Sequence, residues 1–149
     1  MNDPFVSIII PAKDAEKTIE RCVFSVVGLD YTQYEVIVVD DGSRDKTGKM
    51  LQGFSQRIKI ISFPQNRGPS KARNDAAIQA RGEFIAFTDA DCVVDKSWLR
   101  ALLAGFSGPD IVSVGGRQEV PVDESAFGRN VAQGLKRMGL ITDYLRNSD

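Results

Sequence analysis

Short apolar runs recur along the chain and predict buried strands. The first four lie at residues 5–10, 35–39, 58–63 and 84–88, and each is nearly continuous rather than alternating. A parallel strand that is covered on both faces has this pattern, because neither of its sides meets water. A fifth run at residues 111–114 ends at a pair of glycines and is expected to form a further strand.

Between these runs, apolar residues recur at helical spacing. The helix after the first strand is expected to bury one face and to begin at Asp14 or Thr18, since either side chain can cap a helix. Ser43 and Ser70 are expected to cap the next two helices, and Gly82 is expected to end the third. The residues of the first buried face are Ile19, Cys22, Val23, Val26 and Val27.

Two more helical patterns follow. One carries Trp98, which could stack on a sugar or a base, although its spacing from Leu99 and Leu102 favours packing in the core. The other begins near Asp123 and reads as one long or two shorter amphipathic helices. Strands that alternate with helices predict an α/β fold, a mostly parallel sheet with helices on both faces. Ligands of such sheets bind at the carboxyl ends of the strands.

Composition narrows the class of protein. The 149 residues, 42% of them hydrophobic, fit one soluble globular domain over residues 1–149. The net charge of -1 and the lack of a basic patch argue against nucleic acid as a partner, and the strand-sized apolar runs predict no transmembrane segment. The chain has no histidine, which excludes Ser-His-Asp and Cys-His nucleophiles and most zinc sites. Two cysteines without a signal-peptide pattern indicate a reducing, cytoplasmic location.

The tripeptide Asp89-Ala90-Asp91 directly follows the fourth apolar run. Residues two apart in an extended chain point to the same side, so both carboxylates can project together from the carboxyl end of a buried strand. Such a pair suits Mg2+ or Mn2+, with water and substrate phosphates as the other ligands. The alternative is that Asp91 caps a turn and Asp89 is solvated.

A second acidic strand end is Asp40-Asp41. Either carboxylate can accept hydrogen bonds from a nucleobase or a ribose, and either can cap the following helix instead. Further along, the turn at residues 66–70 opens a helix that carries Lys71 and Arg73. Cations at a helix N-terminus suit a phosphate, but a solvent-facing turn with ordinary surface charges has the same sequence.

Four short motifs follow one another along the first two thirds of the chain: VSIIIP at 6–11, VVDDGS at 38–43, NRGP at 66–69 with ARN at 72–74, and ARGEFIAFTDADC at 80–92. In this order they resemble the opening of glycosyltransferase family 2. The resemblance implies the GT-A fold, a Rossmann-like sheet. It also implies transfer of a sugar from a UDP- or GDP-linked donor, with inversion at the anomeric carbon and with Mg2+ or Mn2+ as cofactor.

The resemblance assigns the first two motifs to the nucleotide. Pro11 and Ala12 would line the pocket of the base. Asp41, with Asp40 beside it, would contact the base itself.

The later motifs are assigned to the phosphates, the sugar and the metal. Arg73, with Lys71, would lie near the base or the phosphates. Asp89 and Ala90 would contact the ribose or the sugar. Asp91, together with Asp89, would hold the divalent cation.

Members of the family normally continue to a catalytic-base carboxylate and a Q-x-x-R-W type motif on the acceptor side, and this sequence shows neither. We therefore expect a donor-binding domain that lacks the acceptor-side segment, with Asp123, Glu124 and Asp143 as bases only by default. The alternative is a non-catalytic nucleotide-sugar-binding module that needs a partner or a further segment. The acceptor would be a saccharide or a lipid-linked molecule at the inner face of the membrane, and the C-terminal helix could form a homodimer.

Two other enzyme classes are disfavoured. A dinucleotide-dependent oxidoreductase on a similar sheet would carry G-x-G-x-x-G after the first strand, where this chain has Pro11-Ala12-Lys13. A nucleotidyltransferase would be expected to have a glycine-rich, basic loop at the same place.

Overall fold

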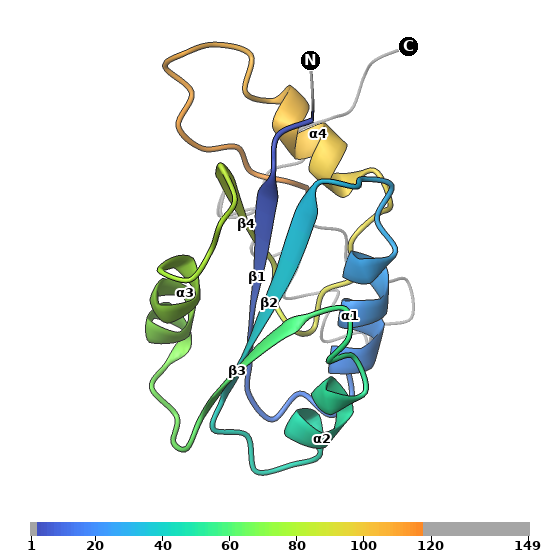
Figure 1. The fold of residues 1–149 in the computed structure, drawn as a ribbon, viewed down its shortest axis with the longest axis vertical. Coiled ribbons are helices and arrows are strands. Elements are labelled where there is room, and N and C mark those ends of the chain that lie inside the picture. The colour runs from blue at the N-terminus through green and yellow to red at the C-terminus, as the bar shows by residue number, and fades with distance from the viewer. Residues whose placement is uncertain (1–2, 118–149) are drawn as a thin grey trace, which may run out of the picture. The chain divides into compact units, whose positions relative to one another are not determined.

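The computed structural model describes residues 3–117, and its main feature is a parallel β-sheet (Figure 1). Four strands form it in the order β3-β2-β1-β4, and all neighbouring pairs run parallel. The strands are β1 (Val6–Ala12), β2 (Tyr34–Asp41), β3 (Lys59–Phe63) and β4 (Phe84–Phe87). The first four predicted strands and the parallel α/β fold are therefore confirmed. The chain divides after Ala101, and the sheet belongs to the N-terminal unit.

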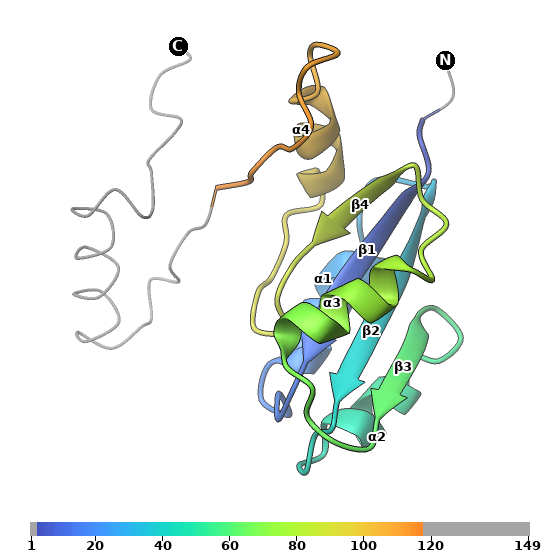
Figure 2. The ribbon, with the colours of Figure 1, turned by 90° about the vertical axis from the view of Figure 1, so that its left-hand side faces the viewer.

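Helices cover both faces of the sheet (Figure 2). The helices of residues 3–117 are α1 (Ile19–Val27), α2 (Thr47–Gln52), α3 (Pro69–Ala77) and α4 (Trp98–Ala104). α1 and α2 lie on one face and α3 lies on the opposite face, as both views show. Within residues 3–117, none of the helices is long and apolar enough to cross a membrane.

The core lies on both sides of the central strands β1 and β2. All five residues of the predicted apolar face of α1 are buried. On the opposite face, Ala72 and Ala76 of α3 pack against Ile9 of β1 and Ile37 of β2. Close packing on both faces holds the central strands in place and so positions the loops at their carboxyl ends.

The cap predicted for the second helix is wrong. α2 starts at Thr47, whose backbone N–H donates a hydrogen bond to Asp45 Oδ1 at 2.9 Å. Ser43 instead accepts a hydrogen bond from the backbone N–H of Asp14, with 3.0 Å between Asp14 N and Ser43 Oγ. A serine side chain in a loop can cap a helix or bond to the backbone of another loop. Here Ser43 bonds to the loop after β1. Thr18 occupies the N-cap position of α1, but its side chain makes no capping bond.

α3 also begins and ends differently from the prediction. Gly68, with a φ of 88°, is its N-cap, and Pro69 follows in the first turn, so Ser70 lies inside the helix. Proline is favoured there because the first N–H groups of a helix have no partner within it. The helix ends well before Gly82, which lies against β1. A Cβ atom on Gly82 would be 2.4 Å from the backbone nitrogen of Ser7, so glycine permits this close approach.

The predicted fifth strand is also wrong. Residues 111–114 belong to no strand, and Ile111 and Val112 are 37% and 90% exposed. An apolar run forms a strand only where a neighbouring backbone completes its hydrogen bonds, and four residues do not specify that neighbour. The helical segment predicted near Asp123, with the candidate bases Glu124 and Asp143 and the proposed dimer contact, lies outside the described residues.

A partly buried hydrogen-bond network ties the amino end of the sheet together. Ser7 is fully buried, and its Oγ donates to Glu35 Oε1 at 2.7 Å and accepts from the backbone N–H of Gly82 at 2.8 Å. Glu35 also accepts hydrogen bonds from the backbone and the guanidinium of Arg81, both at 2.8 Å. Burial by itself would raise the pKa of Glu35, but the hydrogen bonds from Ser7 and Arg81 outweigh it and lower the pKa below 4.5.

Replacing Glu35 by glutamine is expected to lower the free energy of unfolding at pH 7 by about 1–2 kcal/mol, because a charged acceptor is lost. Folding lowers the pKa of Glu35, so its contribution is complete above the unfolded pKa and disappears as the pH falls through the folded pKa. Urea unfolding at pH 7 and again near pH ~3 should therefore show the difference between the two proteins shrinking. An equal difference at both pH values would contradict the assignment.

Candidate active site

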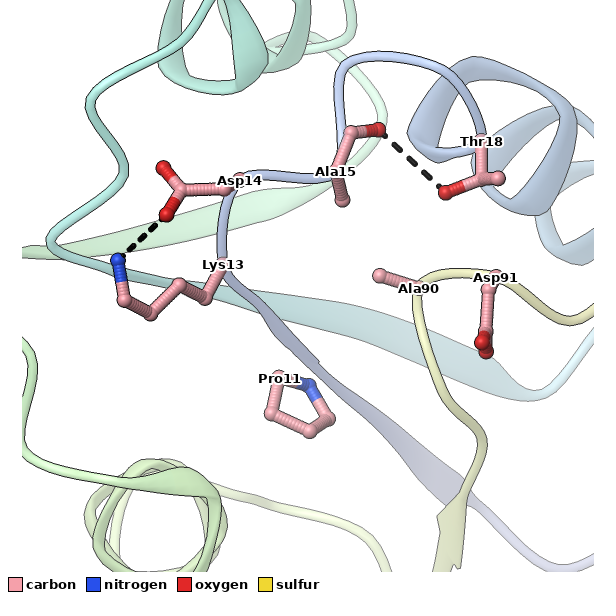
Figure 3. Close-up of a pocket in the computed structure, with 7 residues that line it drawn as sticks. All are labelled: Pro11, Lys13, Asp14, Ala15, Thr18, Ala90 and Asp91. Carbon is pink, nitrogen blue, oxygen red and sulfur yellow. Dashed lines mark hydrogen bonds and ion pairs between the residues drawn. The ribbon is translucent and has the colours of Figure 1, made fainter.

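A cleft opens at the carboxyl edge of the sheet, where β1 and β4 end side by side (Figure 3). Its volume is about 310 Å³. One wall is the loop that leads from β1 to α1, and the other is the turn after β4. The lining residues are Pro11, Lys13, Asp14, Ala15, Thr18, Ala90 and Asp91. Figure 3 shows Lys13 and Asp14 on one side and Ala90 and Asp91 on the other.

The cleft contains three of the nine residues that the sequence proposes for the site. Pro11 lies on its floor, and Ala90 and Asp91 come from the acidic turn. The other six are not among the lining residues; they are Ala12, Asp40, Asp41, Lys71, Arg73 and Asp89. The position of the cleft agrees with the expectation that ligands of a parallel sheet bind outside the carboxyl ends of its strands.

Sequence reasoning missed the residues of the loop after β1. Lys13 Nζ pairs with Asp14 Oδ2 at 2.7 Å, and Asp14 adopts a φ of 48°, which is unusual for a residue other than glycine. The backbone N–H of Arg44 donates to Asp14 Oδ1 at 2.7 Å, and this bond, followed by the contact with Lys13, lowers the pKa of Asp14. The signal was available, because these residues directly follow a strand whose carboxyl end faces the predicted site.

The carboxylates of Asp40 and Asp41 hold loops of the protein. Asp41 is 3% exposed, and its two oxygens accept hydrogen bonds from the backbone N–H groups of Arg67 and Gly68 at 2.7 and 2.8 Å. Asp40 Oδ1 accepts a hydrogen bond from the backbone N–H of Ser43 at 3.0 Å. Asp41 thus connects the end of β2 to the start of α3, an arrangement that neither the base-contact nor the helix-cap interpretation includes.

The first carboxylate of the acidic turn has a cationic partner. Arg73 Nη2 lies 2.5 Å from Asp89 Oδ1, so α3 reaches the turn after β4 through this ion pair. Lys71 is oriented differently, because it pairs with Asp75 on its own helix. The structure therefore brings Arg73, but not Lys71, to the acidic turn.

A divalent cation would find oxygen ligands at this turn. Asp91 is exposed at the cleft, and Asp89 precedes it by two residues. Among residues 3–117, no group of three or more histidine, cysteine, aspartate or glutamate side chains is arranged to hold a metal ion. A hard-oxygen site with one or two carboxylates fits Mg2+ or Mn2+, which commonly complete their coordination with water and substrate phosphates.

Two cysteines lie next to the acidic turn. Cys22 of α1 is fully buried, and burial, reinforced by the nearby Cys92, Asp91 and Asp89, raises the pKa of its thiol to about 12. Burial also raises the pKa of the Cys92 thiol. Both side chains therefore remain protonated at neutral pH, and neither has the lowered pKa of a nucleophilic thiol.

Comparison with known proteins identifies the family of this chain. The family described as "Glycosyl transferase family 2" matches residues 7–147. The chain belongs to glycosyltransferase family 2. Its sequence is 36% identical over 121 residues to Glycosyltransferase AglE of Haloferax volcanii, a match that covers 78% of this chain and 40% of AglE.

Two solved structures that contain nucleotides resemble this chain. A TarS fragment of Staphylococcus aureus in complex with UDP superposes with a TM-score of 0.64 and 34% identity, covering 68% of this chain and 32% of that chain. Mannosyltransferase PcManGT of Pyrobaculum calidifontis, in complex with GDP-Man and Mn2+, gives a TM-score of 0.69 and 25% identity, covering 74% and 34%. This family 2 chain thus spans well under half the length of these relatives.

Proposed function

We propose that the cleft binds a nucleotide-diphosphate sugar and that the protein transfers the sugar, with inversion, to a saccharide or lipid-linked acceptor at the cytoplasmic side of a membrane. The proposal rests on the position of Asp91, which lines the cleft at the carboxyl edge of the sheet in a chain of family 2. A UDP complex of TarS and a GDP-Man complex of PcManGT support this class of donor.

The residues around the cleft divide into three proposed roles. Pro11 and the adjacent Ala12 would border the nucleoside, and Lys13, on the loop that follows, offers a cation to the diphosphate. Asp91, aided by Asp89, would hold Mg2+ or Mn2+. Such a cation, when bound, supplies positive charge that stabilises a diphosphate leaving group.

Arg73 and the two aspartates at the end of β2 shape the site. Arg73 holds the Asp89 carboxylate, and Asp41 holds the backbone at the start of α3, the helix that carries Arg73. Through these contacts the site is largely formed before a donor binds, which lowers the ordering cost of binding. A direct contact between Asp41 or Asp40 and the base, and between Lys71 and a phosphate, remains part of the proposal.

The choice of nucleotide is testable by thermal unfolding of this chain with UDP, GDP, UDP-GlcNAc and GDP-Man, each with and without Mn2+. A ligand at 100 times its dissociation constant stabilises a protein by about 2.7 kcal/mol, so the preferred donor should raise the melting temperature by several degrees. We expect the ligands of one base to raise the melting temperature, and to raise it further when Mn2+ is present. Melting temperatures with all four ligands equal to that of the ligand-free protein would contradict donor binding.

A further inference from the structure

We infer that Cys22 and Ser25 of α1 are positioning residues that hold the acidic turn in the shape needed for a metal-bound diphosphate. The inference rests on the proposed function, because it concerns the geometry of the same site. Two side chains of α1 form hydrogen bonds with the backbone of residues 89–94.

The first attachment is made by a thiol. Cys22 is fully buried, and its Sγ donates a hydrogen bond to the backbone carbonyl oxygen of Asp89 at 3.3 Å. The backbone N–H of Cys92 donates to the same oxygen at 3.0 Å and closes the turn. The carbonyl of Asp89 therefore has one partner within the turn and one on the helix behind it.

The second attachment lies one helical turn further along α1. Ser25 Oγ accepts a hydrogen bond from the backbone N–H of Val94 at 3.1 Å and donates one to the carbonyl of Cys22 at 2.7 Å. Residues three apart share one face of a helix, so Cys22 and Ser25 face the same segment. The two attachments bracket Asp91, with one at residue 89 and the other at residue 94.

The acidic turn is also held from the opposite face of the sheet. Arg73 of α3 binds the Asp89 carboxylate at 2.5 Å, while Cys22 of α1 binds the Asp89 carbonyl. α1 and α3 lie on opposite faces (Figure 2). Asp89 is thus held by its side chain from one layer and by its backbone from the other, which leaves Asp91 on a turn with little freedom to shift.

The bonds from Cys22 and Ser25 are expected to affect nucleotide affinity in the presence of a divalent cation more than affinity in its absence. Removing a group that orients a metal ligand typically costs 10–100-fold in metal affinity, because a loosely held carboxylate must be ordered when the metal binds. The base pocket assigned to Pro11 lies outside this turn, although the ribose or sugar contact assigned to Asp89 and Ala90 lies on it. The expected signature is therefore a larger loss of affinity in the presence of Mn2+ than in its absence.

The test compares Cys22→Ala, Cys22→Ser and Ser25→Ala with wild type by titration of UDP and GDP, with and without Mn2+. We expect Cys22→Ala and Ser25→Ala to raise the dissociation constant in Mn2+ by roughly tenfold. Cys22→Ser keeps a donor at this position and should recover part of the loss. Equal Mn2+-dependent affinities for Cys22→Ala and wild type would overturn the inference.

A matched control separates positioning from general stability. Val23 is a fully buried neighbour on α1, and Val23→Ala removes more apolar volume than Cys22→Ala without removing a side-chain hydrogen bond. Val23→Ala should lower the melting temperature at least as much as Cys22→Ala and leave the Mn2+ dependence intact. A loss of Mn2+ dependence in Val23→Ala as large as in Cys22→Ala would contradict a specific role for the thiol.

Amide hydrogen exchange gives a readout that does not need a ligand. The N–H groups of Cys92 and Val94 should exchange faster in Cys22→Ala and Ser25→Ala respectively, because each variant loosens its own attachment. If wild type shows no metal-dependent binding, the proposed function fails, and exchange still decides whether α1 holds the turn. Unchanged exchange at both amides would overturn the inference.

Discussion

Replacing Asp91 by alanine is expected to abolish the dependence of nucleotide binding on a divalent cation. Asp91 is exposed at the cleft, on a turn held by both neighbouring layers, and it is the carboxylate that we propose as the ligand of the divalent cation. Wild type should bind its nucleotide at least tenfold more tightly with Mn2+ than without, a difference of about 1.4 kcal/mol or more. In Asp91→Ala the two affinities should be equal when measured by calorimetric titration.

The control for this variant is a carboxylate at the other end of the same strand. Glu83 is exposed and directly precedes β4, whereas Asp91 follows it. Glu83→Ala changes the net charge by the same amount as Asp91→Ala. Because Glu83 lies at the end of β4 that is away from the cleft, this variant should leave the Mn2+ dependence unchanged. Asp91 is exposed as well, and its replacement should change the free energy of unfolding by no more than about 0.5 kcal/mol. Retention of full Mn2+ dependence by Asp91→Ala would remove the metal assignment.

The second large effect is expected for Asp41→Ala, and it concerns stability first. Asp41 is buried, and its removal leaves the backbone N–H of Arg67 without its acceptor, while Gly68 N–H keeps only its bond to Asn66 Oδ1 at 2.8 Å. An unpaired group costs about 1–3 kcal/mol and a lost hydrogen bond about 1 kcal/mol, so urea unfolding should show a loss of roughly 3 kcal/mol. Nucleotide affinity should also fall, to the same extent with and without Mn2+, because α3 loses its fixed start.

Two further variants test this explanation of Asp41. Asp41→Asn keeps one acceptor oxygen and should lose less stability than Asp41→Ala. Asp40→Ala removes the neighbouring carboxylate, which accepts one backbone hydrogen bond, from Ser43. Its loss of unfolding free energy should be about half that of Asp41→Ala. An unfolding free energy of Asp41→Ala equal to that of wild type would show that the bonds to the loop before α3 contribute little.

The sequence was sufficient to predict the sheet because its signal is strong and local. Nearly continuous apolar runs identified all four strands, and the helical spacing of Ile19 to Val27 identified a face that is entirely buried. Helix starts were harder to predict, because polar residues compete for the same role. Ser43 bonds to the loop after β1 instead of capping α2, and Asp45, two residues before the helix begins, accepts the hydrogen bond from Thr47 N–H.

Topology predicts which residues lie at the carboxyl edge of the sheet, and their role in binding stays a prediction. Pro11, Ala90 and Asp91 follow from the carboxyl ends of β1 and β4 and line the cleft, whereas Asp40 and Asp41, at the end of β2, do not. Contacts between distant side chains were not predictable. The bond between Cys22 and Asp89 joins residues 67 positions apart, and no local pattern of apolar or polar residues encodes such a pair.

Calorimetric titration of UDP and of GDP into this chain, with and without Mn2+, is the most direct test of a donor site in this cleft. One of the two nucleotides should bind, and Mn2+ should strengthen its binding at least tenfold, or by about 1.4 kcal/mol. Binding of neither nucleotide to the folded chain, in the presence of Mn2+, would contradict a donor site at the carboxyl edge of this sheet.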